Sequence, residues 1–426
     1  MNTADTLSAE QMWVFRLLEE TDKSLFLTGK AGTGKSHLLR YLLRHSTKNI
    51  ALLSYTGLAA ANIGGQTINS FFQIFSQGIY EPQEQIAILE DRDSAYGLKK
   101  MLNKLDIIVI DEISMVRADL FHTINEICKL YRDNQQPFGG LQLLLVGDPY
   151  QLPPVVRPAE IKQMLVKKYG GVHFFNAPEV TNYVGAYQLK QIFRQDDEQF
   201  KHILNNIREG TNLSQVLSLL NTRVGTPKSM QNVVVVATRN DMVDDYNAKQ
   251  LAKLPTQTYT YKAIVKGIFK DRPTNEELVL KEGAQIMMLK NDQMGRWYNG
   301  SIGVITELTK DSIKVEIDGN EYDVEQFTWT NNKYNYDEES DTLDQTYLGS
   351  FTQYPIRLAW AVTVHKSQGQ TYESALINIP QAFDSGQTYV ALSRCKSLEN
   401  LWLARPIKQR DVIVDPAIRQ FMSNIK

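Results

Sequence analysis

The segment that constrains the fold most is "SLFLTGKAGTGKSHLLRYLLRH", residues 24–45 of this 426-residue chain. Its apolar start runs into the glycine-rich loop "GKAGTGKS" (29–36), and leucines at helical spacing follow. A strand, a glycine-rich loop and a helix in this order form a P-loop, in which backbone N–H groups and the helix N-terminus surround phosphate groups. The segment predicts a parallel α/β domain that binds a nucleotide, with Lys35 on the β- and γ-phosphates and Ser36 on Mg²⁺.

Further segments of the same kind follow along the chain. "NIALLSY" (49–55), "LDIIVIDE" (105–112) and "LQLLLVGD" (141–148) are short and apolar throughout. Strands that a parallel sheet buries on both faces have this composition, and their ligands bind at the carboxyl ends. A second α/β set contains "QNVVVVAT" (231–238) and resumes with "RLAWAVTV" (357–364). The chain therefore predicts α/β architecture in both halves.

The pattern changes between residues 256 and 344, where apolar and polar residues alternate. Asp318 and Gly319 separate two of these alternating runs. Asp-Gly between alternating runs is typical of a tight hairpin, so we predict a small antiparallel β insertion. The polar stretch "NNKYNYDEESD" (331–341) is interpreted as a solvated acidic loop, with a metal-binding cluster as the less favoured alternative.

Composition narrows the class of protein. The net charge is −2 and the isoelectric point is near 6.4, so nucleic-acid binding would need a local basic groove. Cys128 and Cys395 are the only cysteines, and their spacing predicts neither a zinc site nor a disulfide framework. The N-terminus has no signal-peptide pattern, and the apolar runs are too short to span a membrane. We expect a reducing, aqueous compartment.

Polar residues at the predicted strand ends are candidates for chemistry. In "VIDEIS", Asp111 would join the Mg²⁺ shell and Glu112 would act as a base toward water. Gln151 in "GDPYQLPPV" is a candidate sensor of the γ-phosphate, and Gln11 in "LSAEQ" could pair with the adenine edge. The alternatives are exposed carboxylates at a strand end and ordinary surface glutamines.

An ordered series of motifs carries a family resemblance. The motifs are "LSAEQ", "GKAGTGKS", "SYTGLAA", "LDIIVIDEISMVRADLF", "GDPYQLPPV", "IFRQ", "AWAVTVHKSQGQT" and "YVALSRCKSLENL". Together they resemble superfamily 1 helicases, and more closely the petite-integration-frequency (PIF) DNA helicase family of the RecD-like superfamily 1B. The resemblance covers nearly the whole chain, apart from the details of the β insertion.

The resemblance implies two tandem RecA-like P-loop domains with parallel sheets, an SH3-like β insertion and a short wedge insertion. Residues 1–180 would form domain 1A, with the wedge 1B at about 64–76. Residues 181–255 and 345–426 would form domain 2A, and the β insertion 2B would span 256–344.

The resemblance also places ATP and Mg²⁺ in a cleft between the two RecA-like domains. One wall would consist of Gln11, Gly29, Gly32, Thr33, Gly34, Lys35, Ser36, Asp111, Glu112 and Gln151, with Ser36 and Asp111 on the metal. The other wall would carry Arg194, Gln368, Gly369 and Arg394. Arg394, in "QTYVALSRCKS", would then be an arginine finger that one chain supplies to its own site.

For DNA, the resemblance implies translocation from 5′ to 3′ on a single strand and unwinding of the duplex. The candidate DNA contacts are Thr56, Phe72, Thr238, Thr363 and His365. Each has a structural alternative: helix caps for the threonines, an interior hydrogen bond for the histidine and core packing for the phenylalanine.

We expect single-stranded and forked DNA as partners, with G-quadruplex DNA as a further candidate. We also expect a monomer that has no membrane partner. The resemblance implies roles in DNA repair, recombination and telomere maintenance. The setting would be the nucleoid-associated cytoplasm of a prokaryote or virus-infected cell, or the nucleus for a trimmed eukaryotic core. Two alternative functions stay open: a DNA-stimulated ATPase clamp or RecD-like subunit without independent unwinding, and a P-loop small-molecule kinase.

Overall fold

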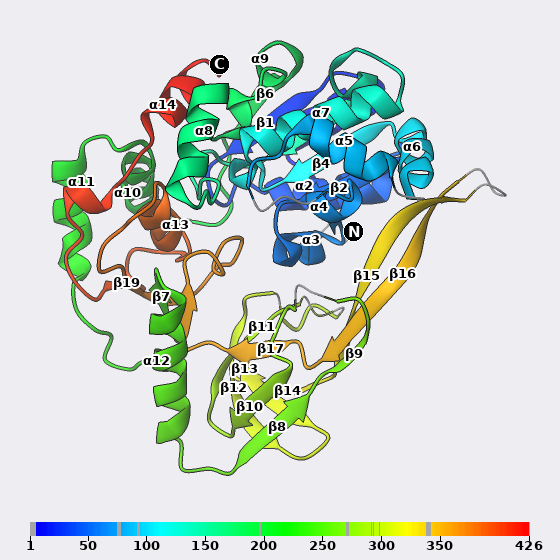
Figure 1. Cartoon of the computed structure of the whole chain (residues 1–426). Coiled ribbons are helices and arrows are strands. Elements are labelled where there is room, and N and C mark those ends of the chain that lie inside the picture. Colours follow the sequence, from blue (N-terminus) through cyan, green and yellow to red (C-terminus); the bar gives the residue numbers. More distant parts are fainter. Residues whose placement is uncertain are drawn as a thin grey trace.

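The computed structural model describes residues 6–74, 78–91, 94–195, 197–269, 272–290, 292, 294–297, 299–337 and 342–425. The described chain contains two parallel α/β sheets and a set of antiparallel strands. Figure 1 shows the first α/β unit at the top in blue and cyan, the second at the left in green and orange, and the antiparallel strands below them. Within these residues, no helix combines the length and apolar character that crossing a bilayer requires.

The first unit is built on a six-stranded parallel sheet in the order β3-β2-β4-β5-β1-β6. Its strands are β1 (Leu25–Gly29), β2 (Ile50–Ser54), β3 (Gln66–Thr67), β4 (Ile107–Asp111), β5 (Gln142–Val146) and β6 (Gly185–Leu189). Every residue of β1, β4 and β5 is buried, which confirms the strands predicted from continuous apolar runs.

Helices pack on this sheet and create two core clusters. They are α1 (Ala9–Glu20), α2 (Lys35–His45), α3 (Gly57–Ile63), α4 (Ile68–Phe71), α5 (Pro82–Glu90), α6 (Ser94–Lys104), α7 (Ala118–Tyr131), α8 (Ala159–Tyr169) and α9 (Val180–Tyr183). Leu25 and Leu27 of β1 join the cluster that contains Leu38 of α2. Phe26, which points to the opposite face, joins the other cluster. The P-loop is therefore anchored by a strand packed on both sides.

Two segments of the first unit lie outside the predicted boundaries. Strand β6 pairs in parallel with β1, so the first sheet extends past the predicted limit at residue 180. Near the C-terminus, α14 (Pro416–Ser423) places Ile418 and Met422 in the core of the first unit. The division at 180 is therefore wrong, and so is the assignment of all of 345–426 to the second unit, because α14 packs in the first unit and residues 345–353 and 356–358 pair with strands of the antiparallel insertion.

The predicted wedge also differs from the structure. In residues 64–74, β3 pairs with β2, and the aromatic side chain of Phe72 is fully buried in the core of the first unit. Ile68 and Phe71 are buried in the same cluster. These apolar side chains gain more from the core than from an exposed wedge. This segment therefore completes the first unit; residues 75 and 76 lie outside the described residues.

The second unit is a four-stranded parallel sheet in the order β18-β7-β19-β20. Its strands are β7 (Val233–Ala237), β18 (Ala361–Thr363), β19 (Ser374–Asn378) and β20 (Leu401–Leu403), and its helices are α10 (Glu198–Glu209), α11 (Leu213–Leu220), α12 (Asn240–Lys253) and α13 (Gln387–Leu392). The segment 357–364, where the α/β pattern resumes, contributes to two strands, because β17 (Ile356–Leu358) pairs with the antiparallel insertion and β18 with β7.

The insertion contains a five-stranded antiparallel sheet in the order β14-β13-β12-β11-β17 and two smaller sheets. Its remaining strands are β8 (Thr258–Lys262), β9 (Ile264–Gly267), β10 (Glu277–Lys281), β11 (Gln285–Met288), β12 (Ile302–Leu308), β13 (Ile313–Ile317), β14 (Asn320–Val324), β15 (Phe327–Asp337) and β16 (Thr342–Gln353). Asp318 and Gly319 both have positive φ and join β13 to β14, which confirms the predicted hairpin.

The stretch predicted as an acidic loop is largely a strand. β15 and β16 pair over their whole length, from Phe327 opposite Gln353 to Asp337 opposite Thr342. The partner strand satisfies the backbone of 331–337 although few of these side chains are apolar, which a pattern of side chains alone does not reveal. Figure 1 shows this long hairpin reaching from the insertion to α6 of the first unit, and β15 contacts α6.

Candidate nucleotide site

The P-loop forms a tight turn at the end of β1. Gly32 and Gly34 have φ values of 85° and 78°, a region that L side chains rarely adopt. The ammonium of Lys35 lies within the loop and donates to the carbonyls of Gly29 at 2.8 Å and Lys30 at 3.2 Å. Burial lowers the pKa of Lys35, and the nearby carboxylate of Asp148 partly offsets this effect. The lysine is therefore held where it can exchange loop carbonyls for phosphate oxygens.

Gln11 lies against the P-loop. Its side chain is 2% exposed, and Nε2 donates to the carbonyl of Gly34 at 3.1 Å. Ser8 and Gln11 form a capping box that fixes the start of α1. Phe193, which the sequence analysis did not single out, is 51% exposed and its ring lies 3.6 Å from a Cβ built on Gly34. An amide and an aromatic face thus flank the same edge of the loop.

Asp111 and Glu112 form a carboxylate pair at the end of β4. The backbone N–H of Glu112 donates to Asp111 Oδ1 at 2.9 Å, and Glu112 has a φ of 52°, an unusual value for a residue with a side chain. Burial first, and the Glu112 carboxylate second, raise the pKa of Asp111 to about 7. Burial also raises the pKa of Glu112. Carboxylate oxygens are the ligands that a hard divalent cation such as Mg²⁺ prefers, so the buried Asp111 carboxylate could hold one at the end of β4.

A glutamine from the second unit reaches this pair. Gln368 Nε2 donates to Glu112 Oε2 at 2.9 Å and to Gln151 Oε1 at 3.3 Å. The neighbouring Gly369 has a φ of 78°, and its Cβ position meets open space. Three residues predicted on opposite walls of a nucleotide site therefore meet across the interface between the two α/β units.

Arg194 also lies at this interface. A Cβ built on Gly32 would come within 2.4 Å of Arg194 Cβ, so the backbone before α10 packs directly on the P-loop. Arg194 Nη1 donates to the carbonyl of Ser393 at 3.4 Å. Burial, followed by repulsion from Arg394, lowers the pKa of Arg194 to about 9. The guanidinium groups of Arg194 and Arg394 therefore lie close enough to repel each other.

Arg394 is 1% exposed, and its donors are engaged within the second unit. Nε donates to Val390 O at 2.8 Å and Nη2 to Ser393 Oγ at 2.8 Å. Nη1 donates to Ser367 O and Gln370 O, both at 3.3 Å. Its charge lowers the pKa of Glu112, which places it within electrostatic range of the carboxylate pair. The arginine-finger role stays a prediction, and it requires the guanidinium to exchange carbonyl partners for a phosphate.

The predicted DNA contacts have mixed placements. Thr56 accepts the N–H of Ala59 at 3.2 Å before α3, and Thr363 accepts the N–H of Lys366 at 3.2 Å after β18, which are capping or turn roles. Thr238 is 6% exposed, and His365 is half-buried with a pKa lowered by burial. Their DNA roles stay predictions.

Phe72 is the exception among the predicted DNA contacts. Its side chain is 0% exposed and packs edge-on against Phe71 at 4.9 Å between ring centroids. A ring enclosed in this way has no face for a base to stack on. The assignment of Phe72 to DNA is therefore wrong for this structure.

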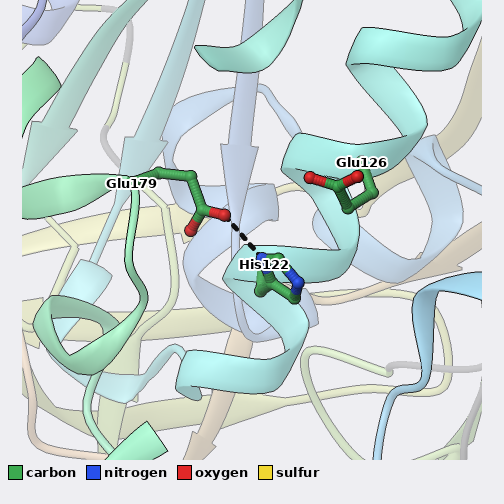
Figure 2. Close-up of side chains that lie close together, drawn as sticks. All are labelled: His122, Glu126 and Glu179. Atoms are coloured by element: carbon green, nitrogen blue, oxygen red, sulfur yellow. Dashed lines mark hydrogen bonds and ion pairs between the residues drawn. The ribbon is translucent and has the colours of Figure 1, made fainter. Parts of the chain in front are cut away.

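A separate group of titratable side chains joins α7 to the segment before α9 (Figure 2). His122 Nδ1 lies 2.5 Å from Glu179 Oε1, and this hydrogen bond raises the pKa of His122. Asn125 Nδ2 donates to Glu179 at 3.0 Å and to Glu126 at 2.7 Å, and Lys129 bonds Glu126 at 2.9 Å. Lys129 and Asn125 bond Glu126, and His122 and Asn125 bond Glu179 Oε1, while Glu179 Oε2 is buried without a hydrogen-bond partner among the described residues; we assign the group a structural role.

Comparison with known proteins decides the family. The PIF1-like helicase model matches residues 6–217. The ATP-dependent DNA helicase Pif1 of Bdellovibrio bacteriovorus is 31% identical over 424 residues, which cover 97% of this chain and 91% of that protein. The chain belongs to the PIF1-like helicase family. It is therefore a helicase, an enzyme that hydrolyses ATP. This helicase spans 65% of the length of the human relative, to which it is 31% identical.

A solved structure supports the same conclusion for the fold. Bacteroides sp Pif1 in complex with ADP-AlF4 matches this PIF1-like helicase with a TM-score of 0.90 and 34% identity, over 98% of this chain and 96% of that one. The two α/β units are accordingly tandem RecA-like domains. Bacteroides Pif1 bound to single-stranded DNA matches with a TM-score of 0.71 and 35% identity, over 98% and 96%.

The close packing of Arg194 on the P-loop predicts the effect of Gly32→Ala. A methyl group 2.4 Å from Arg194 Cβ forces the second unit away from the nucleotide, so the turnover number for ATP should fall by about 100-fold. Steady-state ATP hydrolysis with saturating single-stranded DNA measures this effect.

Gly170→Ala is the matched control. Gly170 has a similar φ of 75°, but its Cβ position meets nothing within 4 Å. It should carry a comparable backbone strain of about 1 kcal/mol and retain parental turnover. Equal losses in both variants would show that strain, not contact between the units, explains the defect.

Proposed function

We propose that this chain is an ATP-dependent DNA helicase that moves from 5′ to 3′ on single-stranded DNA and unwinds forked duplexes, with ATP and Mg²⁺ bound between its RecA-like domains. The observation that carries the proposal is the contact of Gln368 with Glu112 and Gln151, because it links the two domains at the predicted γ-phosphate position. The names of the relatives, and the complex of Bacteroides Pif1 with single-stranded DNA, support the choice of DNA as substrate.

The residues divide the chemistry between the two domains. Lys35 and the P-loop backbone bind the phosphates, and Glu112 accepts a proton from the attacking water, a role that its raised pKa suits. Gln151 and Gln368 orient that water, and Arg194 with Arg394 offset the charge that develops on the transferred phosphoryl group. Ser36 and Asp111 would hold Mg²⁺, which would supply positive charge to offset the phosphate oxygens.

Hydrolysis is coupled to movement through these shared contacts. While the γ-phosphate is present, donors from both domains converge on it and favour the closed arrangement. Loss of the γ-phosphate removes that common partner, so the domains separate. If each domain holds the DNA backbone more tightly in a different state, alternation of the two states moves the strand in one direction. Thr56, Thr238, Thr363 and His365 are the proposed backbone contacts.

Duplex substrates with one single-stranded tail test the proposal directly. With ATP and Mg²⁺, the chain should separate a duplex with a 5′ tail and leave the same duplex with a 3′ tail intact, measured by fluorescence dequenching. Separation from the 3′ tail alone would refute the polarity. DNA-stimulated hydrolysis without separation of either substrate would identify an ATPase clamp, and hydrolysis indifferent to DNA would indicate a different P-loop enzyme.

Arg394→Ala tests the role of the buried arginine. Loss of its charge should lower the turnover number for ATP by about 1,000-fold, the usual size of an arginine-finger effect, and abolish unwinding. Binding of single-stranded DNA without nucleotide, measured by fluorescence anisotropy, should be retained.

Arg223→Ala is the control, because Arg223 likewise donates to backbone carbonyls of the second unit, those of Leu401 and Glu399. It should leave turnover at the parental level. Undiminished hydrolysis in Arg394→Ala would mean that Arg394 has no role in catalysis and only connects α13 to the loop that follows β18 through its hydrogen bonds.

A further inference from the structure

A buried ion pair joins the two RecA-like domains beside the nucleotide site. Asp148 follows β5 in the first domain, and Arg208 lies in the last turn of α10 in the second. Arg208 Nη2 and Nε donate to the two oxygens of Asp148 at 2.8 and 3.1 Å, and the side chains are 2% and 0% exposed. Desolvation makes such a pair a weak source of stability, so its position at the domain interface calls for another explanation.

Tyr389 of α13 connects this ion pair to the P-loop. Its hydroxyl accepts the backbone N–H of Ala31 at 3.0 Å and lies 3.4 Å from Asp148 Oδ2, to which it donates. Tyr389 is 4% exposed, and Ala31 itself packs in the core cluster of the second domain. One hydroxyl group of the second domain thus bridges two separate loops of the first.

The same helix leads to the residues proposed to act on the γ-phosphate. A Cβ on Gly386, the N-cap of α13, would lie 2.2 Å from the carbonyl oxygen of Gln151, so α13 packs directly on the Gln151 loop. Arg394 follows the other end of α13, and α10 contacts α13. Tyr150, which directly precedes Gln151, links the Gln151 loop to the ion pair, because the Arg208 guanidinium lies 4.2 Å from the centre of its ring.

We infer that Asp148, Arg208 and Tyr389 are positioning residues. They form a lock that holds the P-loop, the Gln151 loop and α13 in fixed relative positions, so that Gln151 and Arg394 contact the transition state of ATP hydrolysis together. The inference rests on the cross-domain hydrolysis proposed above. A lock of this kind contributes more to the transition state than to bound ADP, because ADP has no γ-phosphate for the two domains to share.

Two conservative variants test the lock. Tyr389→Phe deletes one hydroxyl group, and Arg208→Lys keeps the charge but loses the bidentate geometry. Each should lower the turnover number for DNA-stimulated ATP hydrolysis by about 10- to 100-fold. Affinity for ADP-AlF4 should fall by a similar factor, while affinity for ADP stays within about two-fold of the parent, both measured by competition with a fluorescent nucleotide.

The matched control is Arg117→Lys. The Arg117–Asp119 pair is also buried and bidentate, with Nε at 2.9 Å and Nη2 at 2.5 Å from the carboxylate, but both residues belong to the first domain. This variant should lower the thermal unfolding temperature without changing the ratio of ADP-AlF4 to ADP affinity. The control therefore separates loss of a buried ion pair from loss of the cross-domain lock.

Two outcomes would overturn the inference: parental turnover in both Tyr389→Phe and Arg208→Lys, or an equal loss of ADP and ADP-AlF4 affinity. If Arg208→Lys does not fold, Tyr389→Phe decides alone, since removing a hydroxyl leaves the packing of its ring. Failure of the proposed function has a different signature, namely no unwinding of the 5′-tailed duplex or ATP hydrolysis that is indifferent to DNA. Arg208→Lys combined with Arg394→Ala should lose no more activity than Arg394→Ala alone, because both act on the same step.

Discussion

The nucleotide site depends on buried charges that neither RecA-like domain compensates alone. Asp111 and Glu112 are carboxylates with raised pKa values at the end of β4. Burial lowers the pKa of Lys35 and of Arg194, so it disfavours the charged form of these cations just as it disfavours the charged form of the two carboxylates. In the proposed function, phosphate oxygens of ATP would pair with these cations, and Mg²⁺ would pair with the Asp111 carboxylate.

Closure of the interface fixes where these groups lie. Gln368 bonds Glu112, Arg194 packs on Gly32, and Tyr389 bonds the P-loop N–H of Ala31. All three contacts join residues far apart in the chain, so they exist only when both domains are in place. They also explain why one chain carries both halves of the site: each half orients groups whose partners belong to the other.

Much of the fold was predictable from local patterns. Strands buried on both faces, such as β4 and β5, show as continuous apolar runs, and Asp318-Gly319 shows as a hairpin turn. The misassigned segments depend on distant partners. β6 joins β1 across more than 150 residues of sequence, and α14 returns to the first domain through a short amphipathic helix. Phe72 shows the same limit, because the sequence pattern of an aromatic residue after a helix is the same whether its side chain faces DNA or the core.

The site was predictable where a motif encodes its own geometry. The P-loop and the Asp111–Glu112 pair lie at strand ends, so their positions follow from the sheet. Phe193 and Tyr389 lie inside motifs used for the family resemblance, but nothing in their spacing names a partner in the other domain. Arg394 was predicted to reach the γ-phosphate from the second domain, and its bonds to carbonyls of its own domain were visible only in three dimensions.

The central claim is that the RecA-like domains close on the γ-phosphate and separate after its loss. Energy transfer between dyes on cysteines introduced at Gln83 and Gln215, exposed positions on α5 and α11, measures this directly because native Cys128 and Cys395 are both buried. With single-stranded DNA bound, the account predicts a shorter distance between the dyes with ADP-AlF4 than with ADP. The same distance in both states, with both nucleotides shown to be bound, would contradict it.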